Sequence, residues 1–148
     1  MMKEKEYSIL INSSIQEVWE IMLGENTYPL WVKGFSENSE MFGEWKEGSE
    51  VDFIDVGRGG TRAILEVVEK PNRVLAKHIA VLSKDRVPQT EGMENWIGTT
   101  EEYLLSEENG VTELKIVMYY HPDYEQMLDE GWRKSLQLLK QLCEEKNS

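Results

Sequence analysis

The chain is short of the side chains that hold metals or form cross-links. It has one cysteine, Cys143, and two histidines, His78 and His121, in 148 residues. One cysteine makes no disulfide within the chain, which is usual in a reducing compartment, and no zinc or haem spacing exists among these residues. We expect no metal and no cofactor. Residues 1–7 lack an apolar signal segment and no apolar run has the length of a membrane span, so we expect a cytoplasmic protein.

Basic residues are also scarce. The chain has 16 Lys and Arg against 28 Asp and Glu, a formal net charge of -12, and no basic cluster. Nucleic-acid binding needs a basic footprint, and an anionic membrane surface would repel this chain, so we expect neither partner and no membrane insertion. The length and composition predict one domain over residues 1–148.

Residues 123–146 carry the clearest pattern in the chain, one long amphipathic helix. Their apolar stripe has helical spacing and consists of Tyr124, Met127, Leu128, Trp132, Leu136, Leu139 and Leu142. Gly131 and Ser135 lie on the same stripe, and a glycine inside a helix costs about 1 kcal/mol against alanine. Such a notch either lets another backbone approach closely or leaves a hollow. Close packing is the simpler reading; we expect a hollow, which a leucine at position 131 would fill.

The rest of the chain predicts an α+β fold. Residues 6–11 alternate as a strand, Ser14 and Glu17 form a capping box for a first helix, and residues 26–33 hold a short second one. Six antiparallel strands follow. They involve Phe42 and Trp45, then residues 51–56, 61–69, 73–82, 96–106 and 111–120, with a hairpin signal at Asn109-Gly110. Residues 83–95 form a long irregular connection, and such connections are often functional.

Six segments in this order resemble the helix-grip fold of the START and birch-pollen-allergen superfamily, also called SRPBCC. They are residues 11–19 (INSSIQEVW), the segment around Trp31, 42–48 (FGEWKEG), 69–73 (EKPNR), 108–114 (ENGVTEL), and Gly131-Trp132 leading into 138–140 (LLK). More narrowly, the chain resembles bacterial homologues of the heat-shock-protein-90 ATPase activator. The resemblance implies a curved antiparallel sheet around the last helix, with two short helices after the first strand and a ligand cavity between sheet and helix.

Polar candidates for chemistry are few. His78 shares a strand face with Val74, Ala76, Ala80 and Leu82, so it is either a lone polar group in a cavity, able to act as an acid or base, or a core histidine satisfied by a neighbour. We favour the second reading because no partner carboxylate is identifiable. We expect His121 to be a structural corner and Cys143 a buried thiol. The acidic strand residues are expected on the surface; they are Asp52, Asp55, Glu101 and Glu102.

Other signatures of catalysis are missing. Residues 57–60 (GRGG) lack the ending of a phosphate loop and join two strands, and no G-x-S-x-G motif is present. We therefore assign no catalytic residue. Aromatic residues are plentiful, with five Trp and six Tyr, and apolar pockets with a few polar points are the usual small-molecule sites. The predicted ligand-binding residues are Trp31, Phe35, Phe53, His78, Trp96, Tyr103, Tyr120, Leu128, Gly131, Trp132 and Ser135.

We therefore predict a protein that holds a hydrophobic small molecule under the C-terminal helix. The superfamily suggests lipids and polyketide-like or flavonoid-like aromatic compounds. Two alternatives stay open. One is a cyclase or hydrolase that uses His78 and cavity tyrosines. The other is a module that contacts a chaperone in the stress response, which the narrower resemblance suggests and for which the protein partner is unidentified.

Overall fold

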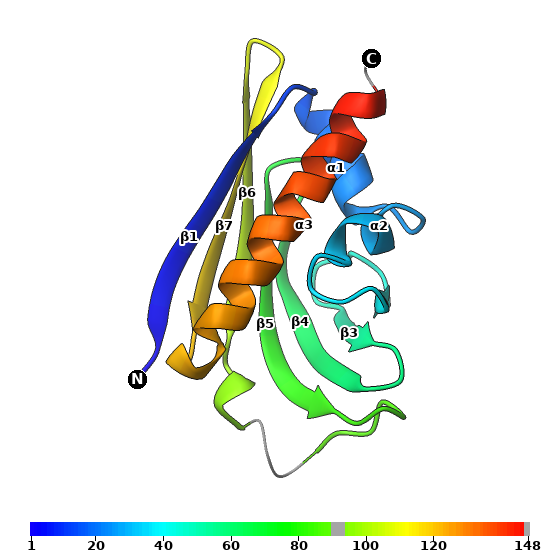
Figure 1. Cartoon of the computed structure of the whole chain (residues 1–148), viewed down its shortest axis with the longest axis vertical. Coiled ribbons are helices and arrows are strands. Elements are labelled where there is room, and N and C mark those ends of the chain that lie inside the picture. The colour runs from blue at the N-terminus through cyan, green and yellow to red at the C-terminus, as the bar shows by residue number, and fades with distance from the viewer. Residues whose placement is uncertain (90–93, 147–148) are drawn as a thin grey trace.

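An antiparallel sheet curls around a long C-terminal helix (Figure 1). The computed structural model describes residues 1–89 and 94–146, and in them the sheet has seven strands in the order β1-β7-β6-β5-β4-β3-β2. The strands are β1 (Lys3–Ile11), β2 (Ser39–Phe42), β3 (Glu50–Asp55), β4 (Gly59–Glu69), β5 (Arg73–Leu82), β6 (Thr100–Glu108) and β7 (Val111–Tyr120). The helices are α1 (Ile15–Leu23), α2 (Tyr28–Val32) and α3 (Glu125–Lys146), with short 3-10 turns η1 (Glu94–Trp96) and η2 (Pro122–Tyr124). The predicted helix-grip architecture is confirmed.

Local signals account for several boundaries. The Ser14 side chain caps α1 by accepting a hydrogen bond from the Glu17 backbone N–H at 3.3 Å. Asn109 and Gly110 both have positive φ, 54° and 81°, as a tight two-residue hairpin between β6 and β7 requires. Pro29 lies in the first turn of α2, where its missing N–H costs no helical hydrogen bond.

Two aromatic residues lie outside the strands that were predicted to contain them. Trp96 does not begin β6; it ends η1, and Gly98, with φ of 95°, turns the chain before the strand starts at Thr100. Trp45 lies beyond β2, which already ends at Phe42. Both side chains pack on the core although they lie outside a strand, so their apolar character did not indicate strand structure. The predicted irregular connection over residues 83–95 includes four residues, 90–93, that lie outside the described ones.

The curl of the sheet coincides with irregular pairing between β4 and β5. The register shifts between Arg62 and Ala63 and again between Leu65 and Val67. Such bulges bend a strand and increase its twist. The first shift lies beside His78, whose partner in the register is Ala63. The bend therefore occurs where the candidate histidine faces the interior.

Helix α3 runs diagonally across the concave face of the sheet, with α1 and α2 beside it (Figure 1). Its buried side includes Leu128, Trp132 and Leu139. Ion pairs join its first turns to the edge strand β1, where Lys5 Nζ lies 2.7 Å from an Asp129 oxygen and the Tyr7 hydroxyl donates to the same carboxylate at 2.5 Å. The helix is thereby attached to the sheet at a polar border as well as through its apolar face.

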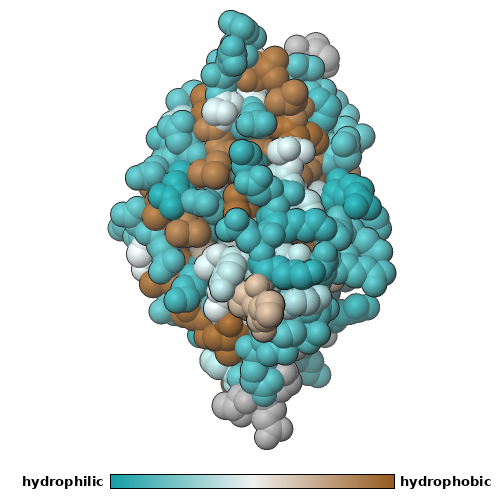
Figure 2. All heavy atoms as spheres, turned by 90° about the vertical axis from the view of Figure 1, so that its left-hand side faces the viewer, coloured by the Kyte–Doolittle hydropathy of each residue, from teal (hydrophilic) through white to brown (hydrophobic). Residues whose placement is uncertain are grey.

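The face of the molecule on the β1 side is mostly polar. Figure 2 shows hydrophilic residues over most of the face seen from the β1 side, with hydrophobic residues scattered between them. This agrees with the net charge of -12. No helix in the described ranges combines the length and the apolarity needed to cross a bilayer.

Candidate functional site

A pocket lies between the concave face of the sheet and the N-terminal half of α3. Its volume is about 210 Å³, and it is partly open to solvent. Helices α2 and α3, the turn after α2, 3-10 turn η1 and strands β2 to β7 all contribute to its wall. The lining side chains used below are Tyr28, Phe35, Ser39, Phe53, Asp55, Thr61, His78, Trp96, Glu101, Tyr103, Met118, Met127, Leu128 and Trp132.

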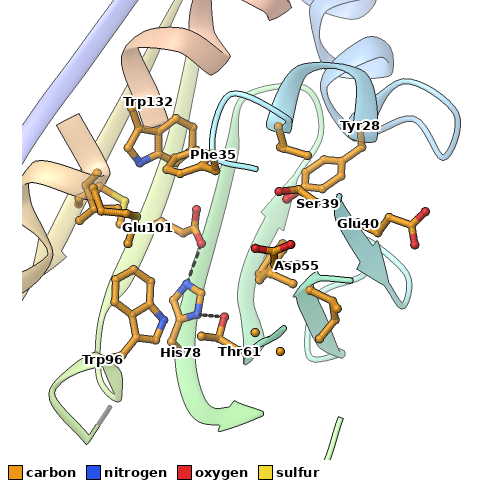
Figure 3. Close-up of a pocket in the computed structure, with 18 of the residues that line it drawn as sticks. Tyr28, Phe35, Ser39, Glu40, Asp55, Thr61, His78, Trp96, Glu101 and Trp132 are labelled. Carbon is orange, nitrogen blue, oxygen red and sulfur yellow. Dashed lines mark hydrogen bonds and ion pairs between the residues drawn. The ribbon is translucent and has the colours of Figure 1, made fainter. Parts of the chain in front are cut away.

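Aromatic rings make up much of this wall. Phe35 and Trp132 meet edge to face with ring centroids 5.1 Å apart, and Trp132 meets Tyr103 in the same way at 5.9 Å. At the other end of the pocket the His78 ring lies between Phe53, at 5.7 Å, and Trp96, at 5.2 Å. Figure 3 shows Phe35 and Trp132 on one side of Glu101, with His78 and Trp96 on the other. The pocket therefore presents flat apolar surfaces to a ligand from more than one side.

A row of hydrogen-bonded polar side chains crosses the pocket wall (Figure 3). His78 Nε2 lies 2.7 Å from Glu101 Oε1, and His78 Nδ1 lies 2.9 Å from Thr61 Oγ1. The Tyr103 hydroxyl donates to the other carboxylate oxygen of Glu101 at 3.0 Å. Because β4, β5 and β6 are neighbours in the sheet, the row runs across strands rather than along one of them.

The hydrogen-bonding roles in this row follow from its members. A carboxylate only accepts, so Glu101 accepts from His78 Nε2–H and from the Tyr103 hydroxyl. In the tautomer with its proton on Nε2, the His78 ring has a lone pair on Nδ1 that accepts from the Thr61 hydroxyl; the roles at both ring nitrogens depend on the tautomer. Burial first and the Glu101 charge second raise the pKa of Tyr103 well above its usual value, so this tyrosine keeps its proton.

Tyr28 adds a polar group that no described residue engages. Its side chain is 8 % exposed and its hydroxyl end is turned toward the middle of the pocket (Figure 3). Among the described residues it has no hydrogen-bond partner. Burial, and then the charge of Glu101, raise the pKa of Tyr28 well above its ordinary value, so it stays a neutral donor and acceptor.

The structure gathers most, but not all, of the predicted site residues at this pocket. The residues that line it are Phe35, Phe53, His78, Trp96, Tyr103, Leu128 and Trp132. Trp31, Tyr120, Gly131 and Ser135 lie outside the lining. Trp31 is buried behind Trp132 and donates its indole N–H to the Met22 carbonyl at 3.0 Å.

The expectation of a hollow at Gly131 and Ser135 is wrong. A side chain at position 131 would overlap the Phe35 ring, and one at position 34 would overlap Ser135 of α3. The turn after α2 thus occupies the notch, with Gly34 against Ser135 and Phe35 against Gly131. A leucine at position 131 would displace Phe35 rather than fill empty space. The cavity lies beside this contact, where Leu128 and Trp132 face the sheet.

The prediction that four acidic strand residues lie on the surface is wrong for Glu101 and Asp52, which are buried, and for Asp55, which lines the pocket. Glu101 is buried because it shares its strand face with Tyr103 and Leu105, which point inward. Asp52 is 3 % exposed and is covered by Arg62 and Arg86, whose guanidinium nitrogens lie 2.8 and 2.9 Å from its oxygens. Burial opposes ionisation of Asp52, but the two arginines outweigh it and lower the pKa of its carboxyl.

Asp55 and Glu102 are both half-buried, and they do different things. Asp55 lines the pocket, and its Oδ1 atom is buried without a partner among the described residues. Glu102 lies on the opposite strand face from Glu101 and accepts from Arg73 Nε at 2.6 Å. Asp55 therefore belongs with the pocket, and Glu102 with the outer face of the sheet.

The sequence interpretation missed Tyr28, Thr61 and Glu101. Period-two alternation carried a usable signal for Glu101, since it is two residues before the candidate Tyr103 on one predicted strand. The favoured reading of His78, a buried histidine satisfied by neighbours, agrees with the contacts to Glu101 and Thr61. It also lines the pocket, so the two readings of His78 are compatible.

The other two candidates occupy structural positions. His121 accepts from the Asp123 backbone N–H at 3.1 Å and caps η2, as expected for a corner. Cys143 is fully buried, and burial raises the pKa of its thiol to about 12. Within residues 1–89 and 94–146, no three His, Cys, Asp or Glu side chains are grouped so as to hold a metal ion.

Comparison with known proteins shows likeness in fold. No family model and no curated protein matches the chain. Among solved structures, the Aha1 dimer from Colwellia psychrerythraea matches with a TM-score of 0.73 and 17% identity, covering 95% of this chain and 96% of that one. CalU16 from Micromonospora echinospora matches with a TM-score of 0.64 and 22% identity over 95% of this chain and 65% of that one.

A third structure is DynU16, described as a putative protein in the dynemicin biosynthetic locus. It matches with a TM-score of 0.73 and 14% identity over 95% of this chain, but this chain spans only 47% of DynU16. At these identities the likeness concerns the fold alone. What the pocket does must therefore be argued from the residues of this chain.

Proposed function

We propose that this protein binds a small aromatic compound that carries at least one oxygen substituent. The observation behind the proposal is the free hydroxyl of Tyr28, 8 % exposed, facing a pocket walled by aromatic rings. Buried polar groups normally have a hydrogen-bond partner, and here a ligand oxygen would supply it. The rings would contribute stacking and edge contacts to a flat ligand.

The pocket volume narrows the ligand classes that the sequence suggested. A cavity of about 150 Å³ is enough for benzene, whereas drug-sized ligands occupy pockets of about 300–1,000 Å³. At about 210 Å³ this pocket suits one or two fused rings. A naphthol fits this description better than a flavonoid or a long-chain lipid does.

Titration with 1-naphthol tests the proposal. We expect quenching of tryptophan fluorescence, because Trp96 and Trp132 line the pocket, and a higher melting temperature through mass action. Naphthalene, which lacks the hydroxyl, should bind more weakly, and Tyr28→Phe should remove most of that difference. Oleate and a flavonoid serve as larger comparison ligands. Absence of any melting shift with naphthol and its one-ring and two-ring analogues would contradict the proposal.

A pair of variants on α3 locates the binding. Met127 lies at the rim of the pocket and is 44% exposed, so Met127→Trp adds bulk there at little cost to folding. Gln126→Trp is the matched control, since Gln126 is exposed and lies outside the lining. We expect calorimetry to show weaker naphthol binding for the first variant only. Equal affinities would mean that the ligand binds elsewhere.

The narrower resemblance, to activators of a chaperone ATPase, is a second candidate. Its support is the fold shared with the Aha1 structure and a basic surface groove between the turn after α2 and α3. Lys33, Arg133 and Lys134 line this groove together with one acidic residue, Glu37, and none of the three forms an ion pair with a described residue. If the groove receives an acidic chaperone surface, Arg133→Glu with Lys134→Glu should abolish binding to a bacterial heat-shock-protein-90 homologue in calorimetry. Unchanged binding would exclude the groove.

A further inference from the structure

Three of the pocket residues have the connectivity of a nucleophile, a base and an orienting carboxylate. Thr61 Oγ1 lies 2.9 Å from His78 Nδ1, and Glu101 Oε1 lies 2.7 Å from His78 Nε2. A hydroxyl, an imidazole and a carboxylate joined in this order are the recurring arrangement for acyl transfer, and it occurs on unrelated folds. All three line the same pocket.

The arrangement has further features that catalysis needs. His78 is 2 % and Glu101 8 % exposed, so the pair is largely shielded from water. Tyr103 holds the second oxygen of Glu101, which fixes the carboxylate and therefore the imidazole. The remaining ring nitrogen, Nδ1, is engaged by the Thr61 hydroxyl. Nδ1 is therefore the ring nitrogen placed to exchange a proton with the Thr61 hydroxyl.

We propose that Thr61, His78 and Glu101 act as a catalytic triad that hydrolyses small esters bound in the pocket. This rests on the proposed function, because the ester must first occupy the ligand site. The substrate class is an ester with a compact acyl group and a one-ring or two-ring alcohol portion, which the pocket volume of about 210 Å³ accommodates. The free Tyr28 hydroxyl is available to hydrogen-bond to an oxygen of such an ester.

The chemical steps balance with water as the only co-reactant. Thr61 Oγ1 attacks the ester carbonyl carbon while its proton moves to His78 Nδ1. The tetrahedral adduct then collapses, the bond to the alcohol oxygen breaks, and that oxygen takes the proton from Nδ1. This leaves an acyl group on Thr61. A water molecule then attacks the acyl carbon and gives one proton to Nδ1. The bond between the acyl carbon and Thr61 Oγ1 breaks, Oγ1 takes the proton back from Nδ1, and the acid leaves. One ester and one water give one acid and one alcohol.

Glu101 and Tyr103 have a different part in this sequence. Glu101 touches no reacting atom; it holds the imidazole in the tautomer that leaves Nδ1 unprotonated and stabilises the imidazolium that forms. Tyr103 positions Glu101. Glu101→Gln should therefore lower the rate and alter its pH dependence, since an amide favours the wrong tautomer as readily as the right one.

Acetylation by 4-nitrophenyl acetate tests the triad. We expect release of 4-nitrophenolate, and intact-protein mass spectrometry after rapid acid quenching should show one added acetyl group, located on the peptide containing Thr61. Thr61→Val, close to isosteric, should remove both signals, and Thr61→Ser should retain them on the serine. His78→Gln and Glu101→Gln should each slow release by about 100-fold or more. Ser106→Ala, at an exposed strand position outside the pocket, is the control and should match the unmodified chain.

The outcomes separate this proposal from the ligand-binding one. Acetyl groups on lysines or other surface side chains, or equal rates for Thr61→Val and the unmodified chain, would overturn the triad. If naphthol still raises the melting temperature in that case, the ligand-binding proposal stands alone. Should Thr61→Val fail to fold, Thr61→Ser decides, because the acetyl group must then be found on Ser at this position.

Discussion

The two halves of α3 meet the rest of the molecule in different ways. In the N-terminal half, Leu128 and Trp132 stand between the helix and the sheet, and a pocket lies among their neighbours. In the C-terminal half, Leu139 is completely buried, and where the two halves meet Ser135 touches the turn at Gly34. Large side chains thus hold the helix away from the sheet, whereas small ones let the backbone of the α2 turn come close. The hollow lies beside the bulky residues, and the small-residue notch is filled.

The largest difference between the halves should appear when a leucine is shortened. Leu139→Ala should lower the free energy of unfolding by about 2–5 kcal/mol, since close-packed surroundings cannot collapse into the space, and naphthol affinity should not change. Leu128→Ala borders an existing cavity, so we expect a smaller loss of stability and altered ligand affinity. Denaturant titration of both variants checks this. Equal losses would mean that the two halves are packed alike.

A pair of glycine substitutions tests the filled notch directly. Gly34→Ala places a methyl group against the Ser135 backbone, which cannot move without the helix, and should cost about 1–3 kcal/mol. The nearest atoms to a methyl group in Gly131→Ala belong to the ring of Phe35, which is 36% exposed and can turn, while the helix gains about 1 kcal/mol in propensity. We therefore expect Gly34→Ala to be the more destabilising of the two in thermal melts. If Gly131→Ala were the more destabilising variant, the account of the filled notch would be wrong.

Tyr103, which lines the pocket beside the N-terminal half of α3, should make the free energy of unfolding fall at alkaline pH. Burial raises the pKa of Tyr103 in the folded protein above its value of about 10 in the unfolded chain. A raised native pKa stabilises the fold below about pH 10 and this contribution is lost as the pH rises further, because the unfolded state ionises first. Tyr103→Phe should flatten the fall in urea midpoint above about pH 10. Tyr119→Phe, at an exposed position, is the control, and an equal effect there would contradict the assignment.

The smallest expected effect concerns the reactivity of the Cys143 thiol, in the C-terminal half of α3. Burial raises the pKa of the Cys143 thiol to about 12, and close packing excludes reagent. The native protein should react with a thiol-specific disulfide reagent far more slowly than the urea-unfolded chain, and 1-naphthol should leave the rate unchanged. Rapid labelling of the native protein would indicate that this half of α3 is open as well.

Local physics in the sequence determined the elements. Hydrophobic alternation placed β5 and β7 with the bounds that the structure has, and the 3.6-residue stripe placed α3 to within two residues at its start. The Asn109-Gly110 pair specified a hairpin and Ser14 a helix cap, because each depends only on neighbours in the chain. The resemblance then supplied the arrangement of these elements, a sheet curled around a helix.

Contacts between distant residues were decided only by the tertiary structure. Glu101 is 23 positions from His78 and reaches it because β5 and β6 pair in one particular register. Gly34 reaches Ser135 because the turn after α2 crosses α3 at that point. Alternation along a strand predicts that a carboxylate points inward, and helical spacing predicts that small residues share one face of a helix. Neither pattern predicts which residue lies opposite. That depends on strand register and on the sizes of all the side chains between the layers, and these are properties of the folded chain as a whole.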